Sequence, residues 1–133
     1  MKKILMGLVA LSLSVFAKFT TIDNDMLLKM QAQGIPVIDI RTPGEWQATG
    51  IIKGSHKMMF FNDKGQPDMG NWFFELGHFV KDKEQPFIIL CAFANRSKAL
   101  GGFLDKQLGF KNIYELKGGI ENGWIKAGKP VVK

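Results

Sequence analysis

The segment that decides the fold reads Phe87-Ile88-Ile89-Leu90-Cys91-Ala92-Phe93-Ala94-Asn95-Arg96-Ser97. Its first four residues are an apolar run of the kind found in a buried strand. After Ser97, apolar residues recur at helical spacing until Gly109, which is placed as a C-terminal helix glycine. The pattern therefore predicts Cys91, the only cysteine in the chain, at the carboxyl end of a buried strand and Ser97 at the start of a helix.

A thiol at this position suits nucleophilic chemistry. Open α/β sheets bind ligands at the carboxyl ends of their strands, and the N–H groups of a following loop and helix favour negative charge there. The thiolate is the reactive form of cysteine, and Arg96 adds a cation able to hold an oxyanion with two parallel hydrogen bonds. A lone cysteine is often only a small buried hydrophobe. The strand-loop-helix setting and Arg96 favour the reactive interpretation, because a structural cysteine needs neither.

Length and composition indicate one globular domain. The chain has 133 residues, 46% of them hydrophobic, and a formal net charge of +6. The lysines are scattered along the sequence rather than clustered, which argues against a nucleic-acid partner.

Residues 1–17 are predicted to be a signal peptide, followed by one domain over 18–133. Lys2 and Lys3 form a basic start, an apolar stretch follows, and Val15-Phe16-Ala17 matches a cleavage site. We expect a periplasmic or secreted bacterial protein with no stable membrane span once the leader is removed. One cysteine cannot form an internal disulfide in that oxidising compartment.

A second set of polar residues lies in and just after the strand predicted at 37–41. Asp39 interrupts this apolar strand, and a buried carboxylate needs partners. It could bond loop backbone near Cys91, while Arg41 and Glu45 are expected to pair with each other as scaffold. We take Asp39, Arg41 and Glu45 as supporting residues of the site.

The remaining patterns alternate between helix and strand. His56 and His78 are isolated, and no metal-ligand spacing occurs, so no metal site is expected. The alternation of helices and strands along the chain favours an α/β fold with a mainly parallel sheet covered on both faces. The further elements expected are a helix beginning at Asp23 and ending at Gly34, a strand over 57–60, a helix over 69–80, a strand over 112–114, and a helix from Gly118 to about Gly128.

Three separated stretches resemble single-domain rhodaneses. The segment 37–46 is similar to the family's D-x-R…E-[FWY] pattern, 91–97 to its cysteine loop, and 116–131 to its L-x-G-G…W…G-x-P ending. The ordered set covers about Thr20 to the C-terminus. It implies a rhodanese-like fold with a central five-stranded parallel sheet and helices on both faces.

The resemblance also implies sulfurtransferase chemistry without a cofactor. In that family the cysteine takes a sulfane sulfur from thiosulfate or a similar persulfide-type donor and passes it from a persulfide to a thiol or cyanide acceptor. Carried over to this sequence, Cys91 is the catalytic residue. The substrate-binding residues are Ala92, Phe93, Ala94, Asn95, Arg96 and Ser97.

Two departures from the family pattern concern the scaffold and the donor. Residues 50–55 replace the usual G-H-I-x-G-A, which we interpret as a scaffold change. The loop lacks the extra arginine or lysine common in thiosulfate-preferring members, and Phe93 with two alanines gives it an apolar rim. These residues point to an organic persulfide or a protein sulfur partner as alternative donors.

Two other functions remain as alternatives. A cysteine phosphatase needs C-x5-R, whereas the spacing here is Cys91-x4-Arg96 with Ser97 at the phosphatase position. A rhodanese-fold binding or sulfur-carrier module without turnover is the other alternative; inactive relatives usually have lost the cysteine, which this chain keeps. A thiol-disulfide oxidoreductase would need a second, resolving cysteine.

Overall fold

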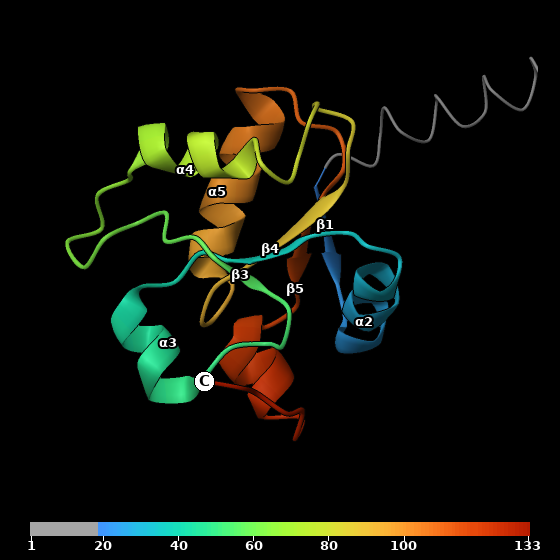
Figure 1. Ribbon diagram of the computed structural model, residues 1–133, viewed down its shortest axis with the longest axis vertical. Coiled ribbons are helices and arrows are strands. Elements are labelled where there is room, and N and C mark those ends of the chain that lie inside the picture. The colour runs from blue at the N-terminus through green and yellow to red at the C-terminus, as the bar shows by residue number, and fades with distance from the viewer. Residues whose placement is uncertain (1–18) are drawn as a thin grey trace, which may run out of the picture.

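The computed structural model describes residues 19–133, so the predicted leader at 1–17 lies outside the described residues. Its elements are, in chain order, β1 (Phe19–Ile22), α2 (Asn24–Ala32), β2 (Val37–Asp39), α3 (Pro43–Thr49), β3 (His56–Lys57), α4 (Met69–Leu76), β4 (Phe87–Leu90), α5 (Asn95–Lys106), β5 (Ile113–Leu116) and the π-helix η1 (Ile120–Ile125). All strands pair in parallel in the order β1-β5-β4-β2-β3 (Figure 1). The predicted α/β fold with a five-stranded parallel sheet is confirmed.

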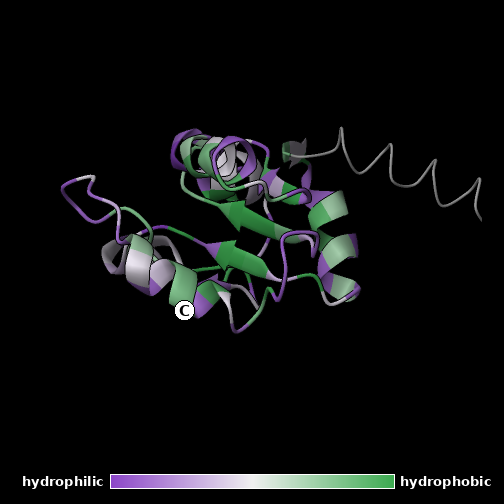
Figure 2. Ribbon diagram, turned by 90° about the horizontal axis from the view of Figure 1, so that it is seen from above, coloured by the Kyte–Doolittle hydropathy of each residue, from purple (hydrophilic) through white to green (hydrophobic). Residues whose placement is uncertain are grey.

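The central strand β4 is buried on both faces. Its side chains alternate, so Phe87, Ile89 and Cys91 pack in one core cluster while Ile88 and Leu90 pack in another. The first cluster is completed by residues of α4 and α5, the second by residues of α2 and η1. Figure 2 shows the hydrophobic strands lying between the helical layers. A strand covered on both sides explains the unbroken apolar run that precedes Cys91.

The edge strand β1 is not among the strands predicted individually from the sequence. It has only four residues, and its two threonines are exposed, so it lacks a clear apolar pattern. Its pairing with β5 joins Phe19 to Ile113 and Ile22 to Leu116. The absence of a side chain at Gly101 lets α5 lie close to it, because a Cβ there would approach the Phe19 ring to 2.3 Å.

The boundaries of several elements differ from those predicted. The strand expected over 57–60 is shorter and earlier, as β3 ends at Lys57. Helix α5 begins at Asn95, two residues before Ser97, so Ser97 lies inside its first turn. The helix expected over 69–80 ends at Leu76. Within residues 19–133, no helix combines the length and the apolar character needed to cross a bilayer.

Candidate active site

Cys91 directly follows β4, at the carboxyl edge of the sheet, as predicted. The next helix, α5, starts at Asn95, and Ala94 before it has a left-handed φ of 74°. Two backbone hydrogen bonds fix the start of this loop, from Ile120 N–H to the Cys91 carbonyl (2.9 Å) and from Glu121 N–H to the Ala92 carbonyl (3.0 Å). The loop is thus tied to the beginning of η1 as well as to α5.

Gly119 makes that tie possible. It has a φ of 71°, and a Cβ there would lie 2.3 Å from the Ala92 carbonyl oxygen and 2.7 Å from that of Cys91. Any larger residue would push the loop away, so this glycine is required by close approach as well as by its dihedral angle.

The sulfur of Cys91 is enclosed by the first turn of α5. Cys91 is fully buried. The Ser97 backbone N–H donates to its Sγ at 3.3 Å, and the Ser97 hydroxyl lies 3.6 Å from it. The Asn95 side-chain oxygen is 3.9 Å away. The expected cradle of amides is therefore represented by one backbone N–H in contact with the sulfur.

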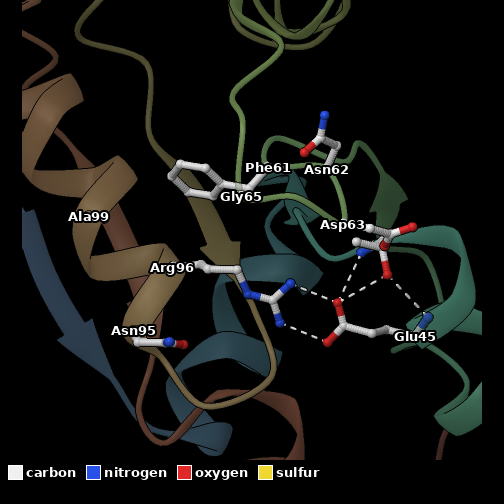
Figure 3. Close-up of a pocket in the computed structure, with 9 residues that line it drawn as sticks. Glu45, Phe61, Asn62, Asp63, Gly65, Asn95, Arg96 and Ala99 are labelled. Carbon is white, nitrogen blue, oxygen red and sulfur yellow. Dashed lines mark hydrogen bonds and ion pairs between the residues drawn. The ribbon is translucent and has the colours of Figure 1, made fainter.

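Arg96 is held by Glu45 rather than free to bind an anion. Its two terminal nitrogens each donate to one Glu45 oxygen at 2.7 Å (Figure 3). This hydrogen bond lowers the pKa of Glu45 to about 2, with burial opposing it and the Thr42 backbone N–H adding to it. The same contact raises the pKa of Arg96 above its ordinary value. The expected pairing of Glu45 with Arg41 is wrong, because Arg96 reaches across from α5 to form a two-pronged ion pair.

Arg41 instead pairs with Asp39, and both side chains are fully buried. The Arg41 guanidinium donates to Asp39 at 2.8 Å through one nitrogen and at 3.0 Å through Nε. It also donates to the Thr49 hydroxyl and the Gly50 carbonyl, so it joins the end of β2 to the end of α3. The alternative in which Asp39 bonds the loop near Cys91 is wrong, since its hydrogen bonds go to Arg41.

A cavity of about 610 Å³ opens beside the ion pair. Figure 3 shows the Arg96 and Glu45 side chains pointing toward each other at this cavity, which Phe61 also lines. Asn95, which contacts the sulfur, also lines this cavity, whereas the buried Cys91 does not. Phe93, the middle of the predicted apolar rim, is 54% exposed. The remaining lining residues are Thr42, Asn62, Asp63, Gly65 and Ala99.

One group near the sulfur has no counterpart among the predicted site residues. Glu115, in β5, is 1% exposed and accepts a hydrogen bond from the Ser97 hydroxyl at 2.7 Å. Its other partners are Thr21 and Lys98. The strand predicted from the sequence ended at 114, so Glu115 was not expected to be buried.

The structure thus gathers Cys91, Asn95 and Ser97 around the sulfur and joins Arg96 to Glu45 at the rim. Ala92 and Ala94 contribute backbone contacts, since the Ala94 carbonyl accepts from the Ser97 hydroxyl at 3.1 Å. Among residues 19–133, no group of three or more His, Cys, Asp or Glu side chains is placed to hold a metal ion.

Known proteins are similar to this chain in sequence and in fold. The family model of the rhodanese-like domain matches residues 23–127. The chain is 27% identical over 107 residues to the thiosulfate sulfurtransferase GlpE of Pseudomonas entomophila, covering 79% of this chain and 84% of that protein.

Two solved structures agree with this match. The polysulfide-sulfur transferase of Wolinella succinogenes, a homodimer, superposes with a TM-score of 0.61 at 25% identity, over 98% of this chain and 90% of that one. A rhodanese-related protein of Thermoplasma volcanium superposes with a TM-score of 0.59 at 26% identity, over 85% of this chain and 97% of that one. The chain therefore belongs to the rhodanese-like domain family.

Proposed function

We propose that this protein is a sulfurtransferase in which Cys91 carries sulfane sulfur as a persulfide. The observation that carries the proposal is the placement of the only thiol at the end of β4, with the Ser97 N–H donating to its sulfur at 3.3 Å. A backbone donor in the first turn of a helix stabilises negative charge on sulfur. Relatives named as a thiosulfate sulfurtransferase and a polysulfide-sulfur transferase support the same class of reaction.

The reaction proceeds in two displacements at sulfur. The Cys91 thiolate attacks the outer sulfur of the donor, a new S–S bond forms, and the rest of the donor leaves with the electron pair of the broken bond. A thiol or cyanide acceptor then attacks the outer sulfur of the persulfide and releases the Cys91 thiolate. No net oxidation occurs, and no cofactor is required.

For the donor, we propose a persulfide on an organic or protein carrier in preference to thiosulfate. Arg96 is the only charged residue between Cys91 and Ser97, and its charge is neutralised by Glu45 at 2.7 Å. The double negative charge of thiosulfate therefore gains little electrostatic stabilisation at this rim. The exposed Phe93 offers apolar contact area to a larger carrier.

Cys91→Ser tests the chemistry, because it keeps the shape of the side chain and removes the sulfur nucleophile. Donor-treated wild type should gain the mass of one sulfur and lose it on addition of cyanide, while Cys91→Ser should do neither. Phe93→Ala is the matched rim variant, and it should slow transfer from an organic persulfide more than transfer from thiosulfate. Normal turnover by Cys91→Ser would overturn the role of Cys91 as the sulfur carrier, and the absence of a persulfide with every donor would leave a binding module as the better description.

We further propose that the protein is exported. The support is the basic start, apolar stretch and Ala17 of the leader. N-terminal sequencing of protein from a bacterial periplasmic fraction should begin at Lys18. A cytoplasmic protein that keeps Met1 would contradict export without affecting the chemistry.

A further inference from the structure

The thiol needs an opening before any donor can reach it. Cys91 has no exposed surface, and it packs in the core cluster that residues of α4 and α5 complete. A displacement at sulfur requires the outer sulfur of the donor to approach Sγ to roughly 3–3.5 Å. At least one group that covers the sulfur therefore has to move during turnover.

The backbone of the loop is held at both ends and is not that group. The carbonyls of Cys91 and Ala92 accept hydrogen bonds from the first residues of η1. The Ala94 carbonyl accepts from the Ser97 hydroxyl at 3.1 Å and from the Lys98 N–H at 3.0 Å. Moving the loop as a whole would break these four hydrogen bonds, so a side chain is the easier part to displace.

The Asn95 side chain is held much less firmly. Its oxygen lies 3.9 Å from Sγ, which is a long contact with a weak hydrogen-bonding group. Within residues 19–133, Asn95 makes no other side-chain hydrogen bond. The residue is exposed, whereas Ser97, which also contacts the sulfur, is buried. Exposed side chains change rotamer within nanoseconds, so a rotation of Asn95 uncovers the sulfur without moving the backbone.

The space on the other side of Asn95 is the cavity of about 610 Å³. Ala99, one helical turn further along α5, lines it together with Asn95 and the ion pair of Arg96 with Glu45 (Figure 3). This volume lies within the range of about 300–1,000 Å³ that is typical of small-molecule sites. The cavity is therefore large enough for an organic molecule, and Asn95 separates it from the thiol.

The loop that forms another wall of the cavity is braced by its own hydrogen bonds. Phe61 and Pro67 form an antiparallel bridge that closes the loop. Inside it, the Asn62 side-chain oxygen accepts from the N–H groups of Lys64 and Gln66, both at 2.9 Å. A wall fixed in this way gives the cavity a defined shape before a ligand enters.

We propose that this cavity binds the organic part of a low-molecular-weight persulfide, and that the Asn95 side chain is the gate between the cavity and Cys91. The inference rests on the proposed function for the nature of the donor, whereas the gate depends only on the geometry around the sulfur. Phe93 does not line the cavity, so it makes a separate contact with the carrier.

Two substitutions of Asn95 test the gate by the rate of alkylation with iodoacetamide, which reports on Cys91 alone because the chain has one cysteine. Asn95→Ala removes the cover and should raise the rate about tenfold, as expected for a gate open about one-tenth of the time. Asn95→Leu keeps the bulk of the side chain without its polar contact, so its rate should not exceed that of wild type.

Ala99→Leu tests the cavity, because it fills space there without touching the sulfur. Iodoacetanilide carries the same reacting group as iodoacetamide with an added phenyl ring. Ala99→Leu should slow iodoacetanilide about tenfold and leave iodoacetamide within about twofold of wild type. The KM for N-acetylcysteine persulfide should rise by a similar factor. Lys106→Leu places the same side chain on an exposed part of α5 and should change none of these values.

A rate for Asn95→Ala equal to that of wild type would overturn the gate, as would a rate for Asn95→Leu as high as that of Asn95→Ala. A faster rate that grows with added urea would come from unfolding and would also count against the gate. Equal effects of Ala99→Leu on both reagents would overturn the assignment of the cavity. Alkylation uses no sulfur donor, so a failure of sulfur transfer is distinguishable from a failure of this inference.

Discussion

The ion pair between Glu45 and Arg96 connects the active-site loop to α3, and Glu45→Gln measures its contribution. Arg96 lowers the pKa of Glu45 from 4.5 to about 2, which corresponds to roughly 3 kcal/mol if fully realised in folding. The two side chains are 24% and 29% exposed, so solvent screens part of the interaction. We therefore expect Glu45→Gln to lower the free energy of unfolding by about 1–2 kcal/mol at neutral pH.

The pH dependence follows from the direction of the shift. The pKa of Glu45 is lower in the folded state, so the contribution is fully present above pH 4.5 and is lost as the pH falls through about 2. The difference in free energy of unfolding between wild type and Glu45→Gln, measured with urea, should become smaller as the pH is lowered through this interval. The same stability for both proteins at neutral pH, or a difference that stays constant with pH, would refute the reasoning.

A second ion pair in the chain provides the control. Lys111 and Glu84 are 3.8 Å apart, and their side chains are 45% and 65% exposed. Glu84→Gln removes the same charge from a solvated pair, so it should change the free energy of unfolding by less than about 0.5 kcal/mol. A loss in free energy of unfolding as large as that of Glu45→Gln would show that removing an acidic charge lowers stability wherever it is removed.

Two further substitutions and one assay of the wild type have defined outcomes. Asp39→Asn leaves Arg41 buried without its counter-charge and should lower the free energy of unfolding by about 3–5 kcal/mol, measured by urea denaturation; a loss under about 1 kcal/mol would contradict this. Gly119→Ala should displace the loop from η1 and lower both stability, by about 2–4 kcal/mol, and sulfur transfer; a variant with wild-type transfer would show that the contact is dispensable. Wild type should hydrolyse an aryl phosphate little or not at all, because the loop is one residue shorter than C-x5-R; turnover comparable with sulfur transfer would reverse the choice of reaction.

The position of Cys91 could be predicted from the sequence because it depends on local patterns. An apolar run, a short loop and helical spacing after Ser97 are each visible within a few residues. The start of α5 was placed two residues late, because Asn95 and Arg96 carry no apolar signal. The four residues of β1 give too short and too exposed a pattern to be identified alone.

The side-chain partners could not be predicted because they depend on tertiary distance. Arg41 and Glu45 are four residues apart and looked like a local pair. Glu45 instead binds Arg96, 51 residues further along the chain. Glu115 reaches Ser97 only because β5 lies next to β4 in the sheet. Sequence spacing identifies which groups are available, and the sheet order determines which of them meet.

The pairing of β1 with β5 has a consequence for the order of folding. The first strand has β5 as its neighbour in the sheet, so Phe19 has no strand partner until Ile113 has been synthesised. Contacts this far apart in sequence form slowly, because a long loop must close first. A chain that emerges N-terminus first therefore keeps β1 open until nearly all of its residues have emerged. The strand that is synthesised first is therefore the last to gain its neighbour in the sheet.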